Sequence, residues 1–168
     1  MSVNMPHLHS LFASLLDGGQ DGPGPHTILL LSITGAVVIS ASTMPAQTRQ
    51  RTVITIAAVA VETWNSMLEL QELDKDPKKD SIENGEDKAI GGWATVEASD
   101  YHFGNVFVCS IPRPDKTEQP LFLIAVSGAE EIDLDLLEER AKMLAEHLSP
   151  IFAGYTDPAS PTSAKHRR

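Results

Sequence analysis

The sequence predicts a single α+β domain in which a helix, two strands, a second helix, three strands and a third helix follow one another. Three observations support this. Apolar residues recur with helical spacing in three segments, and five short runs are rich in aliphatic residues. Short connections join most of the strands, which favours a largely antiparallel sheet. The predicted domain covers residues 5–153, with flexible loops at 17–26, 74–89 and 112–120 and a disordered tail at 154–168.

The first helix and the first two strands are read from apolar spacing. A helical stripe near the N-terminus ends before the turn Asp17-Gly18-Gly19 and consists of Leu8, Leu11, Phe12, Leu15 and Leu16. The apolar stretch from Thr27 to Ser42 is shorter than the ~20 residues that a membrane span needs, and polar residues interrupt it. It therefore predicts a hairpin with its turn at Thr34-Gly35.

The long helix, expected from Thr48 to Leu73, has an unusually wide apolar arc. The centre of the arc consists of Val53, Ala57, Ala60, Trp64 and Met67. One shoulder adds Ile54, Val61 and Leu68, and the other adds Ile56, Val59 and Leu70. The arc spans roughly 200°, whereas one packing surface needs only about 100°. The apolar surface beyond that width must pack against a second element, supplied either by this chain or by a partner.

The second half of the sequence predicts three strands and a helix. Residues 74–89 form an acidic, solvated loop, after which the expected strands are 92–99, 105–111 and 121–126. Asp133 is the predicted N-cap of the last helix, and Pro150 is expected to end or kink it.

Charge and cysteine content exclude several classes of function. The formal net charge is −10, which argues against a nucleic-acid binder because phosphate recognition needs a basic face. The single cysteine rules out a disulfide within the chain and fits a reducing compartment. The first residues lack the pattern of a secretory signal, so a cytosolic location is expected.

No catalytic, cofactor or metal site is predicted. Cys109 and His102 could be imagined as a reactive pair, and whether they lie near each other is left open. No orienting group or oxyanion hole accompanies them, and a thiol within an apolar strand is usually inert. His7 and His9 are not on one helix face, so they are expected to be exposed.

The feature that points to a function is the long helix with its wide apolar arc. It contains Ala57, Ala58 and Ala60, and small residues let another element approach closely. Ile54, Ala58 and Val61 form a line beside the core-facing residues, and an exposed apolar line on a protein surface usually marks an interface. The strand from Trp93 to Ala98 has a chain-neighbour on only one side, which favours a sheet edge.

The element order resembles the roadblock/dynein light-chain domain family, one of the longin-like folds. The segments that carry the resemblance are ILLLSITGAVVISAS, IAAVAVETWNSM, NVFVCSIP, LFLIAVSG and LEERAKMLAEHL. The helix segment, with Trp64 placed late, is most similar to the roadblock subunit of the Ragulator complex and its fungal counterpart in the EGO complex. The resemblance covers about residues 5–153.

This resemblance implies an α/β sandwich: a five-stranded antiparallel sheet with the long helix on one face and the other two helices on the opposite face. It implies pairing with another roadblock-domain protein, as a homodimer or a heterodimer, through the long helix and the third strand. The interface residues expected are Ile54, Ala57, Ala58, Val61, Asn65, Ala94 and Val96.

The same resemblance implies a scaffold function without enzymatic activity. The expected partners are Rag-type small GTPases and a lipid-anchored scaffold subunit, which would recruit the cytosolic chain to the cytoplasmic face of the vacuolar or late endosomal membrane for TOR signalling. The chain itself would not insert into the membrane. Two alternatives stay open: a dynein light-chain or longin-like trafficking adaptor, and a small hydrolase or ligand-binding enzyme using His102 and Cys109.

Overall fold

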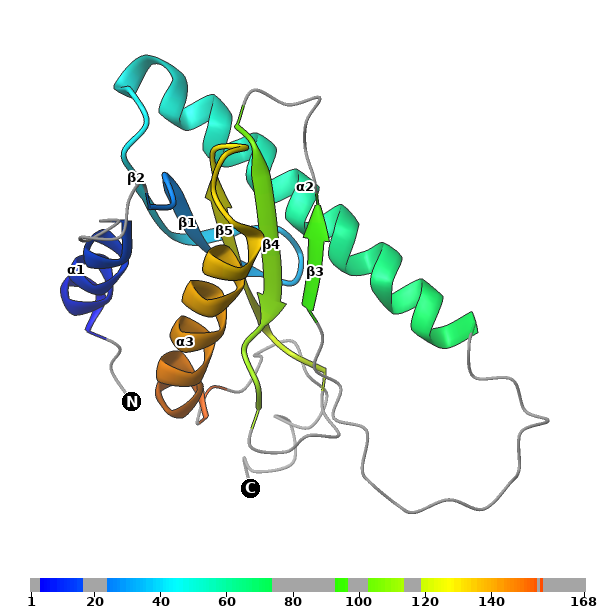
Figure 1. The fold of residues 1–168 in the computed structure, drawn as a ribbon. Coiled ribbons are helices and arrows are strands. Elements are labelled where there is room, and N and C mark those ends of the chain that lie inside the picture. Colours follow the sequence, from blue (N-terminus) through cyan, green and yellow to red (C-terminus); the bar gives the residue numbers. More distant parts are fainter. Residues whose placement is uncertain are drawn as a thin grey trace.

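The computed structural model of the 168-residue chain describes residues 4–16, 24–73, 93–96, 103–113, 119–153 and 155. The elements in chain order are α1 (Met5–Leu16), β1 (Thr27–Ser32), β2 (Val37–Ser42), α2 (Ala46–Leu73), β3 (Trp93–Val96), β4 (Asn105–Ser110), β5 (Phe122–Gly128) and α3 (Leu134–Phe152) (Figure 1). The predicted loop 74–89 lies outside the described residues, as do most of the loops 17–26 and 112–120 and of the tail 154–168.

The strands form one antiparallel sheet in the order β2-β1-β5-β4-β3. Four strands of six or seven residues make up its body, whereas β3 has four residues and lies at the edge beside β4. The expected strand 92–99 is described over its residues 93–96, and its other residues lie outside the described part of the chain. The expected edge position of this strand is confirmed.

The sheet separates two apolar layers, with α2 on one face and both α1 and α3 on the other (Figure 1). Residues of β1 alternate between the layers: Ile28 and Leu30 pack towards α1 and α3, whereas Leu29 and Leu31 pack towards α2. All four side chains are fully buried. The uninterrupted apolar run of β1 is therefore explained by burial on both faces.

Helix α2 packs one stripe against the sheet. The buried residues of this stripe are Ile56, Ala57, Ala60 and Trp64. The helix begins at Ala46, two residues before the expected start. Ala57, expected at the interface, is 5 % exposed and belongs to the core, so that expectation is corrected. Its position at the centre of the apolar arc directs its methyl group to the sheet.

The ends of α3 are only partly as expected. The carboxylate of Asp133 accepts a hydrogen bond from the backbone N–H of Asp135 at 3.1 Å, which confirms the predicted N-cap. The helix does not end at Pro150 but continues to Phe152. A proline affects mainly the turn that precedes it, so the last residues keep helical geometry.

A partly buried polar network joins β1, β2 and β5 to the turn that precedes β4. The His26 ring donates through Nε2 to the carbonyl oxygen of Phe103 at 2.8 Å, and its Nδ1 lies 2.9 Å from the Thr27 hydroxyl. Thr27 contacts the Ser42 hydroxyl at 2.8 Å, and Ser127 donates to the same Phe103 carbonyl at 3.1 Å. A carbonyl only accepts, so the ring nitrogen that faces it, Nε2, carries a proton.

The network fixes the turn that leads into β4. Gly104 in this turn has φ +72°, and a Cβ there would lie 2.2 Å from the carbonyl oxygen of Gly128. Only glycine allows so close an approach between the turn and the end of β5. The network thus ties the turn before β4 to β1, β2 and β5.

Replacing His26 by alanine should lower the free energy of unfolding by about 1–3 kcal/mol, because it removes two partly buried hydrogen bonds. Urea unfolding followed by circular dichroism measures this. The control is His147→Ala, whose side chain is exposed on α3 and whose loss should change stability by less than about 0.5 kcal/mol. Equal effects of the two substitutions would show that the network contributes no net stability.

Candidate docking surface

The side of α2 that faces away from the sheet carries exposed apolar and small residues. Ile54 is 59 % exposed and Leu70 is 67 % exposed, and Ala58 between them is also exposed. Aliphatic side chains of this size are usually buried, and placing an isoleucine in an interface is worth about 1.5–3 kcal/mol. The excess width of the apolar arc therefore lies at the surface of the described structure.

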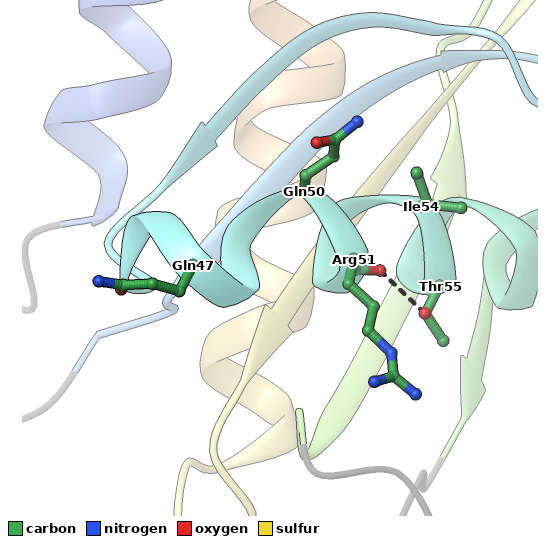
Figure 2. A pocket seen from close by; sticks show the side chains of 5 residues that line it. All are labelled: Gln47, Gln50, Arg51, Ile54 and Thr55. Carbon is green, nitrogen blue, oxygen red and sulfur yellow. Dashed lines mark hydrogen bonds between the residues drawn. The ribbon is translucent and has the colours of Figure 1, made fainter.

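Figure 2 shows the first turns of this face, where a shallow hollow of about 320 Å³ lies over α2. Its lining residues are Gln47, Gln50, Arg51, Ile54 and Thr55. Gln50 and Ile54 point to one side of the helix, whereas Arg51 and Thr55 point to the other. The Thr55 hydroxyl donates to the Arg51 carbonyl at 2.9 Å, a bond within the helix. Such an open hollow on one helix suits a protein surface better than an enclosed small-molecule site.

Val61 differs from the other residues of the predicted line. A Cβ placed on Gly35, in the β1–β2 turn, would lie 3.4 Å from Val61 Cγ2. Val61 is accordingly only partly exposed and packs beside the α2 core layer. Ile54, Ala58 and Asn65 are exposed, so they are the predicted α2 interface residues that remain open to a partner.

The remaining predicted interface residues, Ala94 and Val96, lie in β3, and their side chains are outside the described part. Their backbone pairs with Val108 and Val106 of β4. On its other side β3 has no neighbouring strand among the described residues. α2 contacts β3, so the long helix and the edge strand lie side by side (Figure 1).

By length and composition, α2 is the one helix in the described ranges that is long and apolar enough to cross a membrane, over Ala46–Gln71. Core helices of globular proteins pass the same test. Only 28 % of the most apolar 18-residue window of this stretch is buried, so much of the apolar surface of that window faces outward. Its inner stripe packs against the sheet, and its outer surface carries the exposed residues Ile54, Ala58 and Leu70.

The described residues give little support to a metal site or to a reactive thiol at Cys109. No group of three or more metal-ligating side chains occurs among them. Cys109 is buried, and burial raises the pKa of its thiol to about 12, an effect that nearby Lys142 opposes only in part. His7 and His9 are exposed, and His102 lies outside the described residues. A thiol this far from ionisation is a poor nucleophile.

Alkylation should report this burial directly. At pH 8 a thiol of pKa about 12 is ionised to roughly one part in 10⁴, so Cys109 should react with iodoacetamide at least about a hundredfold more slowly in the folded chain than in urea. Mass spectrometry of timed samples measures the rate. A fast reaction of the folded chain would restore the enzyme alternative.

No protein-family model and no curated protein matches this sequence. Comparison with solved structures shows that the chain has the fold of roadblock/LC7 domains. A roadblock/LC7 domain from Streptomyces avermitilis aligns with 86 % of this chain and 96 % of its own, with 18 % identity and a TM-score of 0.53. Myxococcus xanthus MglB aligns with 91 % and 100 %, with 12 % identity and a TM-score of 0.56. The roadblock part of the fold prediction is thus confirmed.

Sequence reasoning missed one feature of the surface and one polar network. The valines 37 and 38 of β2 are 41 % and 38 % exposed, although a valine pair in a strand suggests burial. Val38 sits at an irregularity in the register, where Leu30 pairs with Ile39 but Leu31 pairs with Val37. The His26 network was also missed, because its partners are far apart in the chain.

Proposed function

We propose that this chain is a non-enzymatic adaptor that pairs with another roadblock domain through the outer face of α2 and the edge of β3. In the finer form of the proposal, the pair belongs to a Ragulator- or EGO-like complex. That complex would hold Rag-type GTPases, together with a lipid-anchored scaffold subunit, at the cytoplasmic face of the vacuolar or late endosomal membrane for nutrient signalling to the TOR kinase.

The observation that carries the adaptor function is the position of the exposed apolar residues. Ile54 and Ala58 lie on the helix that flanks β3, which has no second neighbouring strand among the described residues, and both features favour contact with another protein chain. An edge strand offers backbone donors and acceptors in a row, while the helix offers apolar area beside it. A second roadblock domain presents the same two elements and can therefore match both.

The finer assignment is supported by resemblance in the sequence alone. The α2 segment IAAVAVETWNSM and the hairpin ILLLSITGAVVISAS carry it. The fold permits this role and many others, because function resides in the surface and not in the architecture.

Two measurements test the proposal together. Sedimentation of the purified full chain gives its assembly state, and affinity purification from cell extract with mass spectrometry gives its partners. We expect an assembly or a recovered roadblock-domain partner, accompanied by Rag-type GTPases. A chain that stays monomeric at high concentration and recovers no partner would contradict the adaptor function. Dynein intermediate chains or vesicle-coat proteins among the partners would favour the trafficking adaptor instead.

A further inference from the structure

The described sheet has a second edge, formed by β2, at the end opposite β3. Val37 of β2 lies directly opposite Leu31, whose side chain packs towards α2. Residues directly opposite each other in an antiparallel pair share one face of the sheet, so Val37 belongs to the α2 side. It is nevertheless 41 % exposed, and no described residue of β2 joins the layer beneath α2. Within the described ranges, this side of β2 is uncovered.

The backbone of β2 also turns hydrogen-bonding groups outward. The N–H of Thr43 donates to the carbonyl oxygen of His26 at 2.9 Å, which fixes the alternation of bonds along the β1–β2 ladder. Ser40 and Ser42 therefore direct their N–H and carbonyl groups away from β1. No described strand lies on that side of β2. An extended peptide can add to a row of outward backbone groups of this kind.

The edge formed by β2 lacks the residues that usually protect an edge strand. Natural edges are often guarded by lysine or proline, whereas the β2 segment VVISAS contains neither and carries no charge. Val38 is the extra residue of a bulge, which limits regular pairing to the part of β2 that begins at Ile39. Val38 itself is 38 % exposed. At this end the edge therefore offers valine side chains to a partner.

The other end of the edge carries a positive charge in a fixed place. Arg49 donates through Nε and Nη2 to the carbonyl oxygen of Met44, two residues after β2, at 3.1 and 2.9 Å. Its side chain is exposed and forms no ion pair in the described ranges. Arg49 and Arg51 are the only charged residues between positions 27 and 61, so two positive charges in a chain of net charge −10 leave −12 for the remainder. Most of the protein repels an acidic ligand, whereas this region attracts one.

We propose that the β2 edge binds an extended acidic segment of a partner protein, with its aliphatic side chains against Val37 and Val38 and a carboxylate at Arg49. This goes beyond the proposed function, because the proposed pairing uses β3 at the other end of the sheet. An antiparallel orientation, which every strand pair of the sheet adopts, places the acidic residue before the aliphatic ones. Val38 and Ser42 are about 13 Å apart along the strand, so roughly four to six residues separate the two ends of the bound segment.

A short labelled peptide, with two glutamates followed by alternating valines and threonines, tests the site. Fluorescence anisotropy measures its binding to the full chain. We expect saturable binding, and binding at least roughly tenfold weaker when lysines replace the glutamates. Val38→Asp and Arg49→Glu should each weaken binding by about tenfold or more, because the first removes apolar contact and the second reverses the charge. Ser40→Pro should also weaken it, since it removes an outward N–H at an edge position that tolerates proline.

Arg51→Glu and Met143→Asp are the matched controls. Arg51→Glu changes the net charge as Arg49→Glu does, but no hydrogen bond holds Arg51 at Met44. Met143 is 45 % exposed on α3, away from the β2 edge. Both control variants should bind the peptide within about twofold of the wild-type chain, because an exposed charge at a distance is largely screened by salt. Circular dichroism checks that each variant is folded.

Three results would overturn the inference: no binding of the glutamate peptide, equal binding of the lysine peptide, or equal effects of Arg49→Glu and Arg51→Glu. Sedimentation of the Val38→Asp variant tests a second copy of the chain as the occupant. A wild-type assembly that this substitution dissolves would show that β2 edges pair with each other, which also overturns the acidic partner. None of these results bears on the proposed pairing through α2 and β3, which the recovery of partners tests separately.

Discussion

Replacing Ile54 by aspartate should separate any assembly formed through α2 into folded chains. Ile54 is 59 % exposed, so an aspartate there meets water in the isolated chain and leaves both core layers intact. In the assembly it would lose about 1.5–3 kcal/mol of apolar burial and would also place a charge at the contact. Association should therefore weaken by about a hundredfold or more. Light scattering over a concentration series measures the change.

The matched control for this substitution is Met143→Asp. Met143 is 45 % exposed on α3, on the other side of the sheet, and the same kind of change there should leave association unaltered. Val61→Asp is a less specific variant, because Val61 packs beside Gly35 and its loss would also destabilise the fold. If Ile54→Asp unfolds the isolated chain, the residue faces inward. If Ile54→Asp assembles as normally as the Met143→Asp control does, the interface lies elsewhere.

Replacing Trp64 by alanine should cost about 3–5 kcal/mol of unfolding free energy, which is a large share of the ~5–15 kcal/mol that a typical domain possesses. Trp64 is 2 % exposed and belongs to the layer between α2 and the sheet, so its removal leaves a cavity that neighbouring side chains fill only in part. The midpoint of urea unfolding should fall accordingly, or the chain should fail to fold at 37 °C.

Leu70→Ala is the control within the same helix. Leu70 is 67 % exposed, and its truncation should change the stability of the isolated chain by less than about 0.5 kcal/mol. A comparable loss for both variants would mean that the two sides of α2 are buried to a similar extent. A small loss for Trp64→Ala would show that the layer beneath α2 is loosely packed.

Local patterns allowed much of this fold to be predicted from the sequence. The stripe Leu8, Phe12 and Leu16 predicted α1 and its buried side. The turn at Thr34-Gly35 separates β1 from β2, and Gly35 has φ +92°. These local predictions agree with the structure because helix and strand periods are set by the backbone. The side chains must match those periods wherever one face is buried.

The candidate surface was less predictable. A helical wheel assigned Ala57 to the core-facing arc and placed Ile54 and Val61 on one shoulder, whereas the family resemblance placed Ala57 at the interface. The structure buries Ala57, exposes Ile54 and turns Val61 towards Gly35. A wheel gives angles about one helix axis, but burial depends on where the sheet and the β1–β2 turn lie around that helix.

The sequence by itself determined that this protein is an α+β domain whose long helix has more apolar surface than one sheet can cover, since composition and spacing alone require a second contact. Only the tertiary structure decided which part of that surface is free among the described residues, and it placed β3, the edge strand of the described sheet, against the same helix. It also revealed the His26 network, whose partner carbonyl lies 77 residues away. Contacts over such separations depend on strand order and register, which local periodicity does not specify.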